Sequence, residues 1–322
     1  MPIRAYLYDA TGTDREVSLN AEIVSGLHDR QMLWVDSDSS DEQELRDLTL
    51  LFSLHKDSLS QLLEPERRPR LDNYGTYFQL NVTAIQVNDG KYKLADLRLV
   101  LAPNMILTVH NEPIDFLDSF DRRIKGDSDL GQLNAPAFLA SMLDWHITSY
   151  FRVLEELEAQ ADRLESQALR PRHGRDLLTD MARLRQRIAF VRRVLTPHRE
   201  VYAALARPDF HLLSTSDAAA HYGLLNERLE RSIEAVEHAR ELLVGSFDMF
   251  TTHTALRTNE VMKVLTLVSV ILLPASVIIS LAALLLKSPV NPAGTPGFWW
   301  MLIIILAIAL ITLITARRRR WI

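Results

Sequence analysis

The sequence predicts an α/β domain, followed by long stalk helices and then by two transmembrane helices. Three observations support this fold class. Segments typical of β-strands occur within residues 1–130, helical patterns fill residues 131–258, and two long apolar runs lie within residues 259–322. A chain of 322 residues is long enough for several such units.

The predicted α/β domain covers residues 1–130. Its strand candidates combine β-branched and aromatic residues and are separated by turn residues. They are IRAYLY (3–8), MLWVD (32–36), TYFQLNVTAIQV (76–87), KYKLADLRLVLA (91–102) and MILTVHN (105–111). DEQELRDLTLLFSL (41–54) has helical spacing behind an acidic start, which predicts a helix. The topology of the sheet does not follow from these patterns.

The predicted stalk covers residues 131–258 and is entirely helical. Its helices run from Ala137 to Leu169, from near Arg175 to a bend or end at Pro197, and from Ser216 without a stop signal to Leu286. At 1.5 Å per residue the last of these helices would be on the order of 100 Å long. Such a rod is typical of a stalk in a multi-subunit bundle.

Two apolar runs near the C-terminus predict membrane spans. They cover residues 264–286 and 298–316, and each is long enough to cross roughly 30 Å of hydrocarbon. FWW begins the second run and RRRRWI follows it, as expected at membrane interfaces. The alternative is a pair of hydrophobic core helices, which would not need such flanks.

The distribution of basic residues predicts the topology. Arg317–Arg320 follow the second span, Arg257 and Lys263 precede the first, and the connecting loop carries Lys287 alone. By the positive-inside rule both termini are cytoplasmic and the loop faces outward. The chain is therefore expected to be an integral membrane protein with its α/β domain in the cytoplasm.

Carboxylates recur at helical spacing along the last stalk helix. They are Glu227, Glu230, Glu234, Glu237, Glu241 and, one heptad later, Asp248. The opposite face is largely apolar and consists of Leu225, Leu229, Ser232, Val236, Ala239 and Leu243. Two interpretations stay open. The acidic stripe is either a solvated outer face or the lining of a water-filled axis, where it would gather cations.

The same stripe continues into the first predicted span. There it passes small and hydroxyl-bearing residues, among them Ser269, Ser276 and Ser280. A lipid-facing surface has no use for such residues, whereas a water-filled path does. The pattern therefore favours a pore along this face.

Four segments resemble the CorA-type divalent metal ion channels, a family that includes magnesium channels and a zinc-transporting branch, ZntB. RTNEVMKVLT (257–266), followed by an apolar run with Pro274, is similar to the start of the family's first membrane helix. RRRRWI is similar to its basic tail, and RPRLDNYGTYFQL and MILTVHNEP resemble parts of its cytoplasmic domain. The resemblance implies a funnel-shaped homopentamer, located in a bacterial inner membrane, with the first membrane helices around the pore.

Carried over residue by residue, the resemblance implies roles for several side chains. It places Thr258, Asn259, Met262, Leu265, Leu273 and Ser276 on the pore, and the stripe adds Ser269 and Ser280. Met262 and Leu265 would form part of a hydrophobic constriction. Asp248 would belong to a cytoplasmic regulatory metal site, near the cation-gathering Glu234, Glu237 and Glu241. Arg317–Arg320 would form a basic collar around the pore helices.

One departure from the family concerns ion selectivity. Members end the first membrane helix with Gly-Met-Asn, or Gly-Ile-Asn in part of the zinc branch, where this chain has Ala283, Leu284 and Leu285. Leucine offers no side-chain oxygen, whereas magnesium dehydrates reluctantly and is best held through its waters by oxygen groups. We therefore expect zinc to be favoured over magnesium, with selection at deeper rings, chiefly Asn259.

Two other functions stay open: a Mg²⁺/Co²⁺ channel of the CorA type, and a non-conducting membrane scaffold or regulator that retains this architecture. An enzyme is not expected, because the sequence lacks GxxxxGK[ST], HExxH and GxSxG. The chain has no cysteine, which excludes thiolate zinc sites. The expected partners are further copies of the chain, the lipid bilayer and a transported or regulatory divalent cation, Zn²⁺ or Mg²⁺, without any cofactor. The mild net charge of −5 predicts no nucleic-acid partner.

Overall fold

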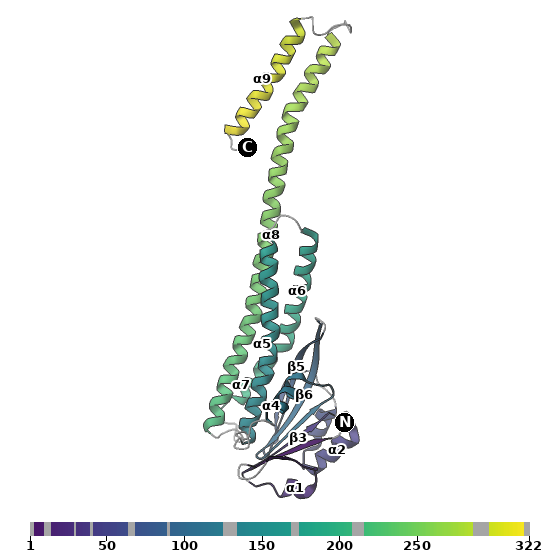
Figure 1. The fold of residues 1–322 in the computed structure, drawn as a ribbon, viewed down its shortest axis with the longest axis vertical. Coiled ribbons are helices and arrows are strands. Elements are labelled where there is room, and N and C mark those ends of the chain that lie inside the picture. The colour runs from purple at the N-terminus through teal and green to yellow at the C-terminus, as the bar shows by residue number, and fades with distance from the viewer. Residues whose placement is uncertain are drawn as a thin grey trace. The chain divides into compact units, whose positions relative to one another are not determined.

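The structure, a computed structural model, falls into two compact units, Met1–Ser246 and Phe247–Ile322. The described residues are 3–9, 14–28, 30–38, 41–63, 68–88, 91–124, 134–168, 174–207, 216–285 and 296–318. The first unit contains a β-sheet and the helices that pack on it, and the second contains the apolar C-terminal region (Figure 1).

Seven strands form one mixed sheet in the order β2-β1-β3-β7-β6-β5-β4. They are β1 (Arg4–Asp9), β2 (Arg15–Glu16), β3 (Gln31–Ser37), β4 (Arg70–Asn73), β5 (Phe78–Asn88), β6 (Lys91–Ala102) and β7 (Met105–His110). The β3–β7 pair is parallel, and all the other pairs are antiparallel. The five predicted strands are confirmed. The sequence did not predict β2 and β4, because both are short and polar.

Four short helices accompany the sheet: α1 (Ala21–Ser25), α2 (Glu42–Leu51), α3 (Lys56–Leu63) and α4 (Asp115–Ile124). Only α2 was predicted from the sequence. Its start is fixed by Asp41, whose side chain accepts a hydrogen bond from the backbone N–H of Gln43 at 3.0 Å, as an N-cap does.

Each face of the sheet carries its own apolar layer. Because side chains alternate along a strand, Leu33 and Val35 of β3 point to the face where they join one buried cluster with Leu45 and Leu48 of α2 and Leu62 of α3. The intervening Trp34 points to the other face. Its ring lies 6.1 Å from that of Phe120 in α4 and 5.5 Å from that of Phe138 in α5.

Three further helices of the first unit follow the sheet in sequence. They are α5 (Ala135–Ala168), α6 (Gly174–Leu195) and α7 (His198–Leu205). The first two confirm the predicted stalk helices. Pro197 does end the second one, and the chain then restarts at once as α7, for which Pro197 occupies the N-cap position.

Helix α8 (Ser216–Leu285) is 70 residues long and carries Pro274 in its interior, which confirms the predicted continuous helix. Its predicted apolar face is also confirmed, because Leu225, Leu229, Ser232, Val236, Ala239 and Leu243 are all buried. In the first unit this part of α8 runs beside α5 and α6 (Figure 1). The Tyr222 hydroxyl donates to the carbonyl of Pro136, and Arg228 reaches Asp144 and Thr148 of α5.

The apolar part of α8 lies in the second unit, together with α9 (Pro296–Arg318). Within the described residues, one helical stretch is long and apolar enough to cross a membrane, Ala220–Leu281. Its most apolar window has a mean hydropathy of 2.6 and contains no buried residue. A shorter apolar stretch, Leu302–Thr312, lies in α9.

Candidate functional site

The predicted pore residues lie on one face of the apolar part of α8. Thr258, Asn259, Met262, Leu265, Ser269, Leu273, Ser276 and Ser280 are all helical and exposed. Residues 259, 262, 266, 269, 273, 276 and 280 follow alternating steps of three and four, which keeps them on one side of a helix. The structure therefore brings the predicted polar residues onto a single open face.

The hydroxyl groups of this face use their hydrogens within α8. Ser269 donates to the carbonyl of Leu265 at 2.9 Å, Ser276 donates to that of Leu273 at 2.8 Å, and Ser280 donates to that of Ser276 at 2.8 Å. A hydroxyl group that donates its hydrogen to a backbone carbonyl can still accept hydrogen bonds through the lone pairs of its oxygen. Such oxygens can accept hydrogen bonds from the water around a cation.

Asn259 is the one side-chain amide on this face. Its side chain is exposed and makes no hydrogen bond with any other described residue. The neighbouring Thr258 hydroxyl, in contrast, donates to the carbonyl of Thr254 at 2.9 Å. The amide oxygen of Asn259 is therefore open to a ligand or to another chain.

The residues that replace the family's filter lie at the end of α8. Ala283, Leu284 and Leu285 form its last described turn, and the structure describes their backbone but not their side chains. Their predicted role at the pore mouth remains a prediction. Arg317 and Arg318 end α9, while Arg319 and Arg320 of the predicted collar lie outside the described residues.

The acidic stripe of α8 divides into two rows. Glu230 and Glu237 are half-buried and paired with arginines: Arg199 binds Glu230 through two hydrogen bonds of 2.8 and 2.7 Å, and Arg192 lies 2.5 Å from Glu237. The outer row, spaced seven residues apart, is exposed and consists of Glu227, Glu234, Glu241 and Asp248. The inner pair connects α8 to α6 and α7. The two interpretations of the acidic stripe, a solvated outer face or the lining of a cation-gathering axis, therefore apply only to the outer row.

The described residues contain no group of three or more His, Asp or Glu side chains placed to hold a metal ion. Asp248 is exposed, and the Thr251 hydroxyl donates to its backbone carbonyl at 2.9 Å. The regulatory metal site at Asp248 therefore stays a prediction.

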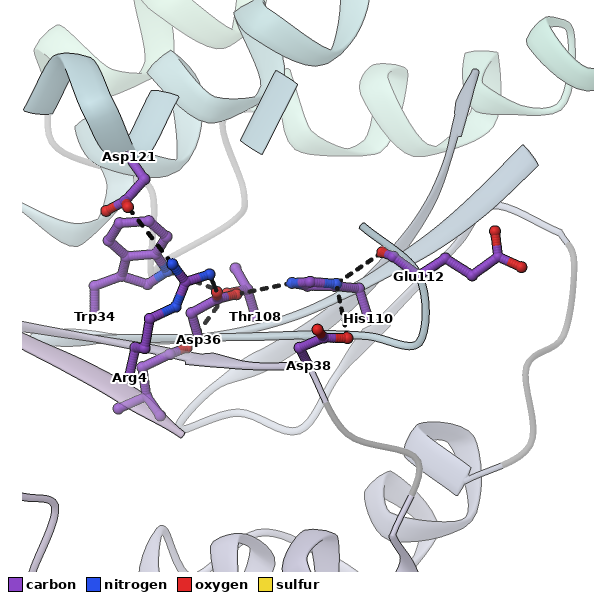
Figure 2. Close-up of polar contacts among 9 residues, drawn as sticks. Arg4, Trp34, Asp36, Asp38, Thr108, His110, Glu112 and Asp121 are labelled. Atoms are coloured by element: carbon purple, nitrogen blue, oxygen red, sulfur yellow. Dashed lines mark hydrogen bonds and ion pairs between the residues drawn. The ribbon is translucent and has the colours of Figure 1, made fainter. Parts of the chain in front are cut away.

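A partly buried row of polar and charged groups, which the sequence patterns did not predict, crosses β1, β3 and β7 (Figure 2). Arg4 stands opposite Asp36, and Asp36 stands opposite Thr108, so their side chains share one face of the sheet. Arg4 Nη2 lies 3.0 Å from Asp36 Oδ2 and Arg4 Nη1 lies 3.7 Å from Asp121 Oδ2, while the Thr108 hydroxyl donates to Asp36 Oδ1 at 2.6 Å.

His110 extends this row between two carboxylates (Figure 2). Its Nε2 lies 3.3 Å from Asp36 Oδ1 and its Nδ1 lies 3.8 Å from Asp38 Oδ1. Because the carboxylates lie beside different ring nitrogens, they do not converge with the ring on one metal position. Burial alone would lower the pKa of His110, but its interactions with Asp36, the Glu112 carbonyl and Asp38 together outweigh burial and raise that pKa. Burial would likewise raise the pKa of Asp36, and its bonds with His110, Thr108 and Arg4 hold that pKa low instead.

Replacing His110 with asparagine is expected to destabilise the first unit in a pH-dependent way. A histidine whose pKa is raised on folding stabilises fully below its unfolded value of about 6.5, and this contribution is lost as the pH rises through the folded pKa. We expect a cost of about 3 kcal/mol at pH 6, because a buried pair loses one partner, and a smaller cost at pH 9. Urea unfolding of residues 1–246 measures both values.

The exposed His28 provides the matched control, since His28→Asn should leave stability unchanged at both pH values. An equal cost of His110→Asn at pH 6 and pH 9 would show that packing, and not the imidazolium, stabilises this part of the sheet.

A second buried polar cluster joins β5 to α5 and α7. The backbone N–H of Thr83 donates to His198 Nε2 at 3.1 Å, and its carbonyl accepts from Tyr150 at 2.6 Å and lies 3.0 Å from His146 Nε2. The Tyr202 hydroxyl lies 2.9 Å from His146 Nδ1. Burial lowers the pKa of His146 to about 4 and that of His198 well below its ordinary value. Both rings are therefore neutral parts of the core.

Comparison with known proteins places these features in a family context. The matching family model is the CorA-like Mg²⁺ transporter protein, over residues 29–318. A divalent cation transporter, CmaX, from Pseudomonas aeruginosa is 25% identical over 334 residues, covering 99% of this chain and 96% of the relative. A cobalt/magnesium transport protein, CorA, from Thermotoga maritima is 23% identical over 273 residues, covering 84% and 77%. Among solved structures, the CorA magnesium transporter of Methanocaldococcus jannaschii matches with a TM-score of 0.78 at 20% identity, covering 100% of both chains, which shows a shared fold.

Proposed function

Because the chain belongs to the CorA-like Mg²⁺ transporter family, we propose that it carries divalent cations across a membrane. The names of its relatives, a divalent cation transporter and a cobalt/magnesium transport protein, support this proposal. Transport, rather than catalysis, is also the function that the residues of α8 suit best.

The observation that carries the proposal is a polar face on an unburied apolar helix. The most apolar window of α8 has no buried residue, so lipid or further copies of the chain must cover it. Lipid offers no partner for Asn259 or for the serine oxygens, whereas a hydrated cation path between copies does. A scaffold that conducts nothing has no need for this face.

We propose a homopentamer of the bacterial inner membrane with both termini in the cytoplasm. Its spans are residues 264–286 and 298–316, within the transmembrane part 259–322, which follows the α/β domain (1–130) and the stalk (131–258). In this assembly the Asn259 faces of several copies surround one axis, and Arg317–Arg320 form a collar around them. Support comes from the basic flanks of both spans and from the length of α8.

The absence of native cysteine makes this topology directly measurable. A cysteine introduced at Thr295 should react with an impermeant thiol reagent on intact cells, and one introduced after Met1 should not. The opposite labelling would overturn the topology. Native mass spectrometry of the detergent-solubilised protein should show five copies, and a monomer would overturn the assembly.

For the transported ion we propose Zn²⁺ in preference to Mg²⁺. Leu284 and Leu285 offer no oxygen with which to hold a hydrated magnesium ion. Zinc accepts oxygen and nitrogen ligands at low coordination number, so deeper rings such as Asn259 suffice for it. The named cobalt/magnesium relative favours the second candidate, a Mg²⁺/Co²⁺ channel.

Flux into proteoliposomes, measured separately for Zn²⁺, Mg²⁺ and Co²⁺ with the purified full chain, tests the proposal. Flux of any of these ions above that of protein-free liposomes would support divalent cation transport. Faster Zn²⁺ than Mg²⁺ flux would support the ion preference, and the reverse order would refute it. No flux of any ion, from protein that is pentameric in the same preparation, would indicate the non-conducting scaffold.

The outer acidic row should raise the local cation concentration. We expect the triple change Glu227→Gln, Glu234→Gln and Glu241→Gln to lower flux severalfold at 10 mM salt and little at 300 mM, because the Debye length falls from about 30 Å to below 10 Å. The measurement is initial flux at both salt concentrations.

The paired residues of the inner row give the matched control for this change. Replacing both members of one pair, Glu230→Gln together with Arg199→Gln, leaves the net charge of the helix surface unchanged, so it should change flux less than the triple variant does. Unchanged flux of the triple variant at 10 mM salt would show that the outer row is only a solvated helix face and does not concentrate cations.

A further inference from the structure

A basic groove lies in the first unit, where β6, α5 and α6 meet. It is separate from the proposed pore face, the outer acidic row and the two polar clusters of the sheet. Its volume is about 830 Å³, which is within the usual range for small-molecule sites. Leu164 and Leu184 contribute buried apolar surface, and the charged lining consists of three arginines, Arg163, Arg183 and Arg187, and one carboxylate, Asp180. The lining thus carries a net positive charge. Strand β6, which contributes Tyr92 to the lining, lies beside α6 (Figure 1).

The arginines of the groove differ in what already binds them. Arg163 of α5 is exposed and has no ion-pair or hydrogen-bond partner among the described residues. Arg183 lies 3.2 Å from Asp180, but both side chains are exposed, so this pair contributes little stability and can exchange. At least two guanidinium groups, one from each helix, are therefore available to an anion.

Aromatic rings lie among these charges. The rings of Tyr92 and Phe190 stack at 6.1 Å with an interplanar angle of 14°, and the Arg187 guanidinium lies 5.6 Å from the centre of the Tyr92 ring. Arg187 also donates to Gln160 at 3.1 Å, which fixes it in place. Planar bases stack on such surfaces, and arginine forks bind phosphate oxygens in pairs.

We propose that this groove binds a nucleoside polyphosphate, with its phosphates on Arg163 and Arg183 and its base against the Tyr92–Phe190 wall. Inorganic phosphate would leave most of the groove empty, and an uncharged nucleoside would not use the arginines. Helix α6 is joined to α8 by the Arg192–Glu237 ion pair, so the bound nucleotide would contact an element linked to the proposed pore helix. Any effect on transport rests on the proposed function, but the binding itself does not.

Equilibrium dialysis of the full chain in detergent with radiolabelled ATP, in buffer containing a metal chelator, tests the proposal. We expect saturable binding, with tripolyphosphate and adenosine each competing at least tenfold less well than unlabelled ATP. Tripolyphosphate that competes as well as ATP would overturn the assignment to a nucleotide. Absence of saturable binding would overturn the site, whether or not the protein transports ions.

Substitutions of exposed residues locate the site without threatening the fold. Arg163→Gln should weaken ATP binding about tenfold, and Asp180→Asn should strengthen it about threefold. Arg185→Gln is the matched control, because Arg185 is an exposed arginine of α6 outside the groove lining. If Arg185→Gln weakened ATP binding as much as Arg163→Gln does, the binding would reflect general charge attraction, and the assignment to the groove would be overturned.

Discussion

Replacing Asn259 with leucine is expected to reduce divalent cation flux at least tenfold. In the proposed pentamer this change removes one amide oxygen per subunit from the same level of the pore. A hydrogen bond to a charged group contributes about 1.5–3 kcal/mol, which corresponds to roughly tenfold to a hundredfold in rate or affinity. An apolar ring in its place offers a cation no substitute for water and adds a dewetting barrier. Flux of Zn²⁺ and Mg²⁺ into proteoliposomes at matched protein density measures the effect.

Leu285→Ala serves as the counterpart at the pore mouth. It should leave the ratio of Zn²⁺ to Mg²⁺ flux unchanged, because neither leucine nor alanine offers a ligand. If Leu285→Ala changed the ratio of Zn²⁺ to Mg²⁺ flux and Asn259→Leu did not reduce flux, ion selection would have to be assigned to the pore mouth and not to Asn259.

The first unit is expected to lose about 3 kcal/mol of stability on acidification through His146 alone. This histidine is fully buried and neutral, with a pKa lowered by burial to about 4. For a histidine whose pKa is lowered on folding, the unfolded chain takes up the proton first, so stability is complete above pH 6.5 and is lost as the pH falls toward 4. His198, which is lowered further by burial and by the nearby His146, adds to the same slope.

Urea unfolding of residues 1–246 at pH 7, 6, 5 and 4.5 measures this slope. His146→Gln should be less stable than the wild type at pH 7, because Tyr202 and Thr83 lose a buried partner, but should lose less stability on acidification. The exposed His238→Gln should follow the wild-type curve. If His146→Gln and the wild type had parallel curves, protonation of His146 could not be the cause of acid unfolding.

Some elements of the fold could be predicted because their signal is local. The heptad spacing and uninterrupted pattern between Ser216 and Leu285 predicted one helix. The strands β5, β6 and β7 followed from their β-branched and aromatic residues and from the turn residues between them. The short helices α1 and α3 have too few residues to show a period. The parallel pairing of β3 with β7 joins segments about seventy residues apart, and no local pattern specifies such a pairing.

The site residues divide in the same way. Asn259 and the serines of α8 could be found because helical spacing alone places them on one face. The partners of Glu230 and Glu237 could not, since Arg199 and Arg192 come from separate helices whose packing only the structure shows. Asp36 and His110 each appear in the sequence as a polar residue at the end of a buried strand, which is a weak signal until β3 and β7 are known to be neighbours.

The hydroxyl hydrogens of Ser269, Ser276 and Ser280 have a consequence for the sign of the permeant charge. Each of these hydrogens is already bound to a backbone carbonyl of α8, so the serines present lone pairs and no donor to whatever passes. Chloride needs donors to replace its hydration, whereas a cation or its water needs acceptors. In the proposed pore, these three positions would therefore exclude anions without any fixed negative charge. They would present the same oxygen acceptors to every divalent metal ion.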